Sequence, residues 1–258
     1  MRLESTLREH RDSGRKLLVP YVTGGMGRSW LDVVRAVADA GADAIEIGIP
    51  FSDPVMDGRT IQEASQRALD IGATPSNIVA DCNRLDVPVP LVVMTYYNVV
   101  NHAGHERFAA SLADAGIDGA ILPDLPLDEL DGWGEAADAA GVETVLLAAP
   151  TTTDARLAQI CARVHGFLYG VSLMGVTGER SRLDTQAATM GRRCKAATDV
   201  PVLLGVGISN AAQAVEAARN ADGVIVGSAL VRRLLQGGGP AEAGAFVSEL
   251  RTALDASP

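Results

Sequence analysis

Residues 40–49 read Ala-Gly-Ala-Asp-Ala-Ile-Glu-Ile-Gly-Ile, and this stretch decides the fold class. An amphipathic pattern ends at Ala40, Gly41 is suited to a helix C-terminus, and a short apolar run follows at once. The same arrangement recurs at Ala115-Gly116 and at Ala140-Gly141. Helices that lead directly into strands, several times along one chain, predict an α/β fold with a parallel sheet.

Eight short apolar runs are spread along the chain, and each is followed by a helical pattern. The predicted strands are Leu17–Val22, Ala44–Ile49, Leu91–Thr95, Gly119–Leu122, Thr144–Ala148, Phe167–Val171, Val202–Leu204 and Gly223–Val226. The predicted helices are Leu3–Ser13, Trp30–Ala40, Ile61–Leu69, Pro75–Leu85, His105–Ala115, Leu127–Ala140, Asp154–Val164, Thr185–Ala197, Ala211–Asn220, Ala229–Leu235 and Ala241–Leu254.

This strand count fits a closed barrel and also an open, doubly wound sheet. After the first strand the chain reads Tyr21-Val22-Thr23-Gly24-Gly25, without the G-x-G-x-x-G pattern of dinucleotide-binding sheets. We therefore expect one (β/α)₈ TIM barrel over residues 1–258, with an extra N-terminal helix and a short phosphate-binding helix after strand eight.

The composition narrows the function classes. Of 258 residues, 47% are hydrophobic and 4% aromatic, which suits parallel strands packed under helices. The net charge of −10 argues against a nucleic acid or an anionic membrane as partner. The N-terminus has no apolar signal-peptide core, so a cytoplasmic protein is expected. Cys82, Cys161 and Cys194 are widely spaced, which predicts free thiols and no metal site.

The second predicted strand carries the first catalytic candidate. Side chains alternate along a strand, so Ile45 and Ile47 face the helices while Glu46 and Gly48 face the barrel interior. A buried carboxyl has a raised pKa, which suits general acid–base work near neutral pH. The alternative is a structural glutamate paired with an Arg or Lys inside the barrel.

The loop after this strand reads Pro50-Phe51-Ser52-Asp53-Pro54-Val55-Met56-Asp57-Gly58. It leaves the carboxyl end of a barrel strand, where active sites of this fold lie. Asp53 and Asp57 are therefore candidates to reach over the barrel mouth. Turn and capping roles, which Asp commonly has in loops, are the alternative.

Glycine-containing loops follow the last three strands, at residues 175–178, 205–209 and 227–229. Glycine lets backbone N–H groups approach an anion closely, and Ser228 adds a hydroxyl at the start of a short helix. Each loop alone is compatible with ordinary turns. Their order, at the place where barrels commonly hold phosphate, predicts a phosphate site.

With these motifs together, the sequence resembles the tryptophan synthase α subunit nearly end to end. The segment Glu46 to Pro54, continued by Asp57-Gly58 and Ile61-Gln62, is highly specific to that family. Supporting matches are Pro20-Tyr21-Val22-Thr23, Met94-Thr95-Tyr96-Tyr97-Asn98, Tyr169 with Ser172, Gly175-Val176-Thr177-Gly178, Gly205-Val206-Gly207-Ile208-Ser209 and Gly227-Ser228-Ala229.

The resemblance implies a lyase that splits indole-3-glycerol phosphate into indole and glyceraldehyde 3-phosphate. It implies Glu46 as the acid–base residue and Asp57 as the carboxylate on the indole N–H. A loop at 175–186 is expected to close over the substrate. The implied substrate-binding residues are Tyr21, Tyr96 and Ile121 around the indole, Tyr169 beside the glyceryl chain, and Thr177, Gly178, Gly207, Gly227 and Ser228 at the phosphate end.

The resemblance also implies a β subunit partner in an α₂β₂ assembly. Pyridoxal phosphate is expected in that partner, and no cofactor in this chain. Arg59 follows Asp57-Gly58 where the family usually has proline, and Gly24-Gly25-Met26 and Pro123 are further departures. A stand-alone lyase that releases free indole and a non-catalytic regulatory barrel are therefore alternatives. A histidine-pathway isomerase barrel would lack the Pro-Phe-Ser-Asp-Pro loop.

Overall fold

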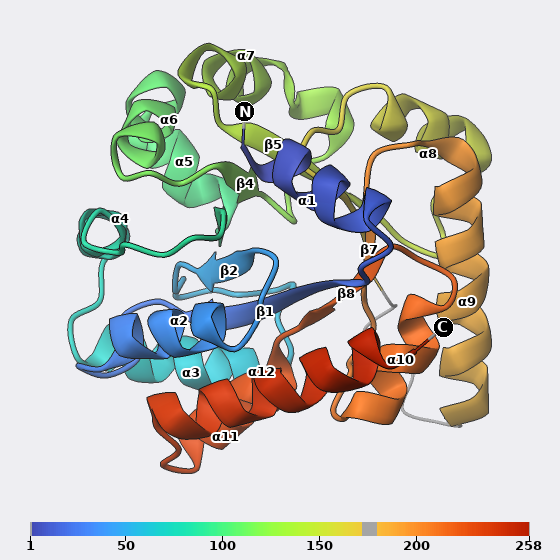
Figure 1. The fold of residues 1–258 in the computed structure, drawn as a ribbon. Helices are drawn as coiled ribbons and strands as arrows, with labels where there is room; N and C mark the ends of the chain where they lie inside the picture. The colour runs from blue at the N-terminus through green and yellow to red at the C-terminus, as the bar shows by residue number, and fades with distance from the viewer. Residues whose placement is uncertain (1, 172–179, 258) are drawn as a thin grey trace.

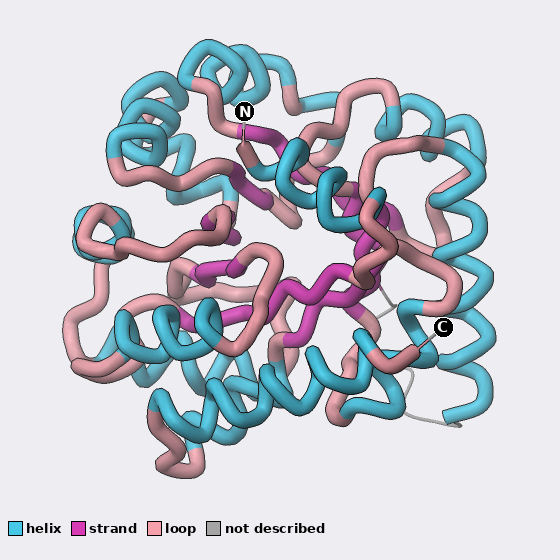
Figure 2. Tube along the Cα trace, in the orientation of Figure 1, coloured by secondary structure: helices cyan, strands magenta, loops and turns pink. Residues whose placement is uncertain are grey.

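The computed structural model describes residues 2–171 and 180–257, and over these residues eight parallel strands form a closed barrel. Each strand pairs with the next along the chain, and β8 pairs with β1. Figure 2 shows the strands enclosed by helices. The strands are β1 Leu17–Thr23, β2 Ile45–Gly48, β3 Leu91–Met94, β4 Gly119–Ile121, β5 Glu143–Ala148, β6 Leu168–Val171, β7 Val202–Gly205 and β8 Gly223–Val226.

The helices cover the outer face of the barrel (Figure 1). They are α1 Leu3–Asp12, α2 Trp30–Asp39, α3 Arg59–Asp70, α4 Pro75–Cys82, α5 Tyr97–Ala103, α6 His105–Asp114, η1 Leu127–Glu129, α7 Asp131–Ala140, α8 Asp154–Cys161, α9 Arg180–Ala197, α10 Ala211–Ala218, α11 Ser228–Leu235 and α12 Pro240–Asp255. The expected TIM barrel, with its N-terminal helix and the short helix after strand eight, is confirmed.

The two faces of the strands pack into different cores, as the alternation in β2 predicts. Ile45 and Ile47 belong to the core between strands and helices, whereas Ala44 belongs to the core inside the barrel. Leu3 and Leu7 of α1 are fully buried in that inner core. Helix α1 therefore closes the amino end of the barrel, and the carboxyl ends of the strands form the accessible mouth.

Aspartates at the amino end hold neighbouring strands together. Asp43 accepts a hydrogen bond from the Leu18 N–H at 2.7 Å, and its own N–H donates to the Leu18 carbonyl at 2.9 Å. Asp118 exchanges the same two hydrogen bonds with Leu91, and Asp222 with Val202. Each aspartate precedes an even-numbered strand and ties it to the strand before it. We call these three residues the aspartate locks.

Asp43 carries the most partners of the aspartate locks. Besides Leu18, its carboxylate accepts hydrogen bonds from His10 Nδ1 and Arg15 Nε, both at 2.7 Å, and from Arg251 Nη1 at 3.2 Å. Asp43 is fully buried and Arg251 is nearly so. This carboxylate therefore joins α1, β1 and α12 at one buried point.

The structure corrects some helix boundaries. Helix α5 at Tyr97–Ala103 was not predicted from the sequence. Gly104, with φ of 87°, separates it from α6. The predicted helix Leu127–Ala140 is a 3₁₀ turn followed by α7, and α9 begins at Arg180 instead of Thr185. The three cysteines are free thiols, as predicted. Among the described residues no helix combines the length and apolarity that crossing a membrane requires.

We expect Asp43→Ala to lower the free energy of unfolding by roughly 3–5 kcal/mol, because it removes the buried partner of Arg251 and leaves that guanidinium with only the half-exposed Asp255 carboxylate. Urea unfolding, followed by circular dichroism, measures this loss. Asp39→Ala on the exposed end of α2 is the control and should change stability by less than about 0.5 kcal/mol. Equal effects of the two substitutions would contradict the role of Asp43.

Candidate active site

A cavity of about 440 Å³ opens at the carboxyl ends of the strands. Predicted site residues from several elements line it together: Tyr21, Glu46, Asp57, Tyr169, Gly207, Gly227 and Ser228. Tyr96 is buried beside the Asp57 loop, and Ile121 is fully buried in the inner core, so neither lines this cavity. Thr177, Gly178 and the other residues of the expected closing loop up to 179 lie outside the described residues.

Glu46 lies inside the barrel, between Tyr21 of β1 and Val92 of β3 in the strand register. Its side chain is 1% exposed, and Oε2 has no hydrogen-bond partner among the residues that the structure describes. Burial, with a smaller contribution from the nearby Asp57 charge, raises the pKa of Glu46 to about 8. A buried, unpaired carboxyl beside a cavity is typical of a catalytic group and not of a structural ion pair.

Two glycines in the strands leave room for the tyrosine rings of the site. A Cβ atom at Gly48 would overlap the Tyr21 hydroxyl, and one at Gly205 would lie 2.5 Å from Cε2 of Tyr169. These glycines therefore leave space for two buried phenol rings beside Glu46. Burial raises the pKa of Tyr169 well above its ordinary value, so its phenol stays protonated near pH 7.

Asp57 reaches the cavity from the loop between β2 and α3, directly before the Gly58 N-cap of α3. Burial raises the pKa of Asp57 to about 6, and a hydrogen bond from the Tyr96 side chain opposes this rise. Asp53, the other candidate of this loop, is exposed and its carboxylate accepts a hydrogen bond from Ser52 Oγ at 2.6 Å. Only Asp57 of the two aspartates lines the cavity.

The part of the same cavity that follows β7 and β8 is formed by backbone and small side chains. Gly205 and Gly207 come from the end of β7, and Gly227 and Ser228 lie at the start of α11. A helix N-terminus presents free N–H groups and a partial positive charge, which favours an anion. None of the cavity-lining residues within the described part of the chain is a Lys or Arg.

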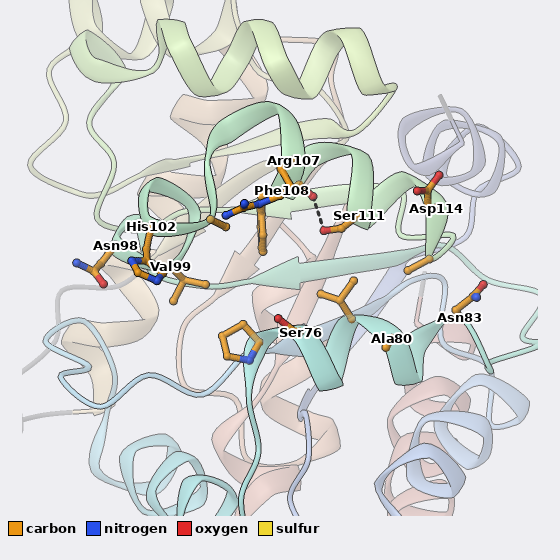
Figure 3. Close-up of a pocket in the computed structure, with 14 residues that line it drawn as sticks. Ser76, Ala80, Asn83, Asn98, Val99, His102, Arg107, Phe108, Ser111 and Asp114 are labelled. Carbon is orange, nitrogen blue, oxygen red and sulfur yellow. Dashed lines mark hydrogen bonds between the residues drawn. The ribbon is translucent and has the colours of Figure 1, made fainter.

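A larger cavity of about 720 Å³ lies outside the barrel, between α4 and the pair α5 and α6 (Figure 3). Its floor includes Val79 and Phe108, and Arg107 and Asp114 are exposed at its rim. It contains none of the described site residues predicted from the sequence. Across residues 2–171 and 180–257, no group of three or more His, Cys, Asp or Glu is placed to hold a metal ion. The mouth cavity is therefore the candidate active site.

The family comparison agrees with this geometry. Residues 7–252 match the family model described as tryptophan synthase alpha chain. The chain belongs to the tryptophan synthase alpha chain family. It is 46% identical over 237 residues to the tryptophan synthase alpha chain of Streptomyces coelicolor, covering 90% of this chain and 88% of that protein. The corresponding chain of Chloroflexus aurantiacus is also 46% identical, with 90% of each chain covered.

Solved structures of tryptophan synthase share the barrel. A Mycobacterium tuberculosis tryptophan synthase chain superposes with a TM-score of 0.90 at 38% identity, with 98% of each chain covered. The Legionella pneumophila tryptophan synthase subunit alpha superposes with a TM-score of 0.85 at 32% identity, again with 98% of each chain covered. The resemblance and the fold expected from the sequence are thus confirmed.

Several apolar residues that line the cavity of this alpha chain family member were not predicted from its sequence as substrate-binding residues. They are Val55, Met56, Ile61, Met94, Pro123, Leu147, Ala149, Val171, Ile208 and Ile225. Met94, Leu147 and Ile225 point inward at the carboxyl ends of β3, β5 and β8. Applying the strand alternation used for Glu46 to all eight strands would have found these three.

The buried Glu46 predicts a pH dependence of stability. Because its folded pKa of about 8 exceeds the ordinary value of 4.5, the native chain holds a proton that the unfolded chain releases. Stability therefore falls as the pH rises from 4.5 to 8, by about 1.4 kcal/mol for each unit of displacement. Glu46→Gln escapes this loss, so its melting temperature relative to the unsubstituted chain should increase between pH 5 and pH 9.

Differential scanning calorimetry at several pH values measures this difference. Asp57 and Glu143 also have raised pKa values, but both remain in the variant and their contributions cancel in the comparison. Glu63→Gln on the exposed face of α3 is the control, and its difference should not change with pH. A difference for Glu46→Gln that stays constant from pH 5 to pH 9 would rule out a neutral Glu46.

Proposed function

We propose that the mouth cavity performs the retro-aldol cleavage of indole-3-glycerol phosphate to indole and glyceraldehyde 3-phosphate. The bond between indole C3 and the adjacent glyceryl carbon breaks, and its electron pair stays with the indole. A proton is added at C3, and the hydroxyl proton of the glyceryl carbon leaves as the aldehyde forms. The reaction thus consumes one proton and returns one, so a single acid–base group can serve both transfers.

The observation that carries this proposal is the difference in pKa between the two carboxyls. With a pKa of about 8, Glu46 is protonated at pH 7 and has the proton that C3 requires. With a pKa of about 6, Asp57 is ionised at pH 7 and can stabilise positive charge that develops at the indole N–H. Two neighbouring carboxyls in different environments therefore take the acid role and the electrostatic role.

The rest of the cavity supports the same substrate. Apolar side chains such as Met94, Leu147 and Ile225 suit an indole ring. Gly207, Gly227 and Ser228 suit a phosphate bound by N–H groups and a helix N-terminus. Thr177 and Gly178 would complete this phosphate site on the resemblance alone. Tyr169 lines the same cavity, and the resemblance implies a place for it beside the glyceryl chain.

We also propose a tryptophan synthase β subunit as the partner, with pyridoxal phosphate bound there and no cofactor in this chain. Val55 and Met56, at the tip of the Asp57 loop, are 79% and 46% exposed. Adjacent exposed apolar side chains suit a protein contact. Arg59, the departure from the family pattern, is exposed close by at the first position of α3. A stand-alone lyase remains the alternative.

Indole release from indole-3-glycerol phosphate by the purified chain tests the reaction. We expect Glu46→Gln to lower kcat roughly 10²–10⁴-fold, because it removes the proton donor. Asp57→Asn should lower kcat roughly 10²-fold or more, because it removes the charge on the indole N–H. Glu63→Gln is the exposed control. Undiminished indole release by Glu46→Gln would refute the catalytic assignment and favour a non-catalytic barrel.

Adding a tryptophan synthase β subunit tests the partner. Coupling between subunits through the Asp57 loop should raise indole production by roughly 5–150-fold. We expect Met56→Ser to weaken this activation, since it removes apolar contact area from the loop. The three-dimensional fold of the chain should not change. Full turnover by the chain alone, with no response to the β subunit, would instead support the stand-alone lyase.

A further inference from the structure

Tyr96 lies two residues after β3, directly before α5, and its side chain is buried. Its hydroxyl accepts a hydrogen bond from the Met56 N–H at 2.8 Å. The same hydroxyl lies close enough to the Asp57 carboxyl group to lower its pKa, and as the phenol is protonated it is the donor toward that carboxylate. One phenol group therefore holds both the backbone and the carboxylate of the Asp57 loop.

The ring of Tyr96 holds the other end of the same loop. Its centroid lies 5.0 Å from that of Phe51, with the two rings stacked at 24°. Phe51 opens the segment that Asp57 closes. The seven-residue segment 51–57 is thus contacted at its start by the ring and at its end by the hydroxyl.

A second, weaker set of contacts holds the Asp57 loop from its solvent side. Nε2 of Gln62 in α3 donates a hydrogen bond to the Asp57 carbonyl at 2.8 Å and lies 3.4 Å from the Pro54 carbonyl. This side chain is exposed, so water competes for these hydrogen bonds and they hold the loop less firmly than the buried contacts of Tyr96 do. Tyr96 is therefore the main support of the loop from inside the protein.

We propose that Tyr96 is a positioning residue for the cleavage reaction, which aims the Asp57 carboxylate at the substrate through its hydroxyl. Tyr96 is not among the described residues that line the mouth cavity, whereas Asp57 is, so its effect on the reaction passes through Asp57. This role differs from the place beside the indole that the family resemblance implies. It rests on the proposed function, because the reaction reports on the position of Asp57.

The hydroxyl has an electrostatic consequence as well as a geometric one. Its hydrogen bond lowers the pKa of Asp57 and so opposes the effect of burial. Without this donor, Asp57 would hold its proton to a higher pH and would lose the charge that stabilises the indole. The acidic limb of the pH profile of kcat should therefore move to higher pH, whereas KM should change little.

Tyr96→Phe removes only the hydroxyl. We expect kcat at pH 7 to fall roughly ten-fold or more and the acidic limb to rise by about one pH unit, as for the loss of a hydrogen bond to a charged group. Tyr97→Phe is the matched control, because the adjacent tyrosine uses its hydroxyl on His105 Nε2 at 3.0 Å, away from the cavity. Its pH profile should remain unchanged.

A profile of Tyr96→Phe that coincides with that of Tyr97→Phe would overturn the proposal. If Tyr96→Phe does not fold, Gln62→Met tests the hydrogen bonds that hold the Asp57 loop from its solvent side. It should lower kcat several-fold with little change in KM, whereas Gln66→Met, which loses only the exposed Asp70 contact, should not. Equal kcat values for the two methionine variants would then reject loop positioning.

A measurement that needs no catalysis tests the positioning role of Tyr96 independently of the proposed function. Carbon-13 NMR of the Asp57 carboxyl group gives its pKa directly in the folded chain. A higher Asp57 pKa in Tyr96→Phe than in Tyr97→Phe supports the positioning role even if the chain releases no indole. Identical Asp57 titrations in the two variants would overturn it even if the unsubstituted chain is an active lyase.

Discussion

The hydrogen bonds of the aspartate locks set the strand register, and the site at the other end of the barrel depends on that register. Asp43 precedes Glu46 by three residues, so the pairing of Asp43 with Leu18 determines which face of β2 Glu46 occupies. A slip of one residue would turn Glu46 toward the helices and Ile45 into the cavity. The amino end of the barrel therefore secures the geometry, while the carboxyl end carries the chemistry.

The fold was predictable because its signals are local and repeated. Strand alternation correctly placed Glu46 inside the barrel, and glycines 41, 116 and 141 have the positive φ that helix ends require. Helix α5 was missed because a seven-residue helix is too short for a clear periodicity, and its apolar residues resemble a continuing strand. The predicted helix Leu127–Ala140 divides at Leu130, between the 3₁₀ turn and α7, and no Gly or Pro stands at that residue to mark the break.

The site was only partly predictable, because the sequence does not show which inward layer of side chains reaches the cavity. Ile121 faces inward as expected, yet it lies fully buried, whereas its register partner Met94 lines the cavity. Strand stagger decides that difference, and stagger is a property of the closed barrel. The contact of Tyr96 with the Asp57 loop joins residues about forty positions apart, so no local pattern indicates it.

The apolar side chains of α1 have a consequence for the acid at the centre of the barrel. Leu3 and Leu7 fill the amino end, with Ala44 in the same cluster directly below Glu46. A high pKa for Glu46 requires a surrounding of low dielectric constant, and water entering from below would solvate its carboxylate as effectively as water from the mouth. The N-terminal helix thus insulates the Glu46 carboxyl group electrically from solvent at the amino end of the barrel, although no residue of that helix lines the cavity at the mouth.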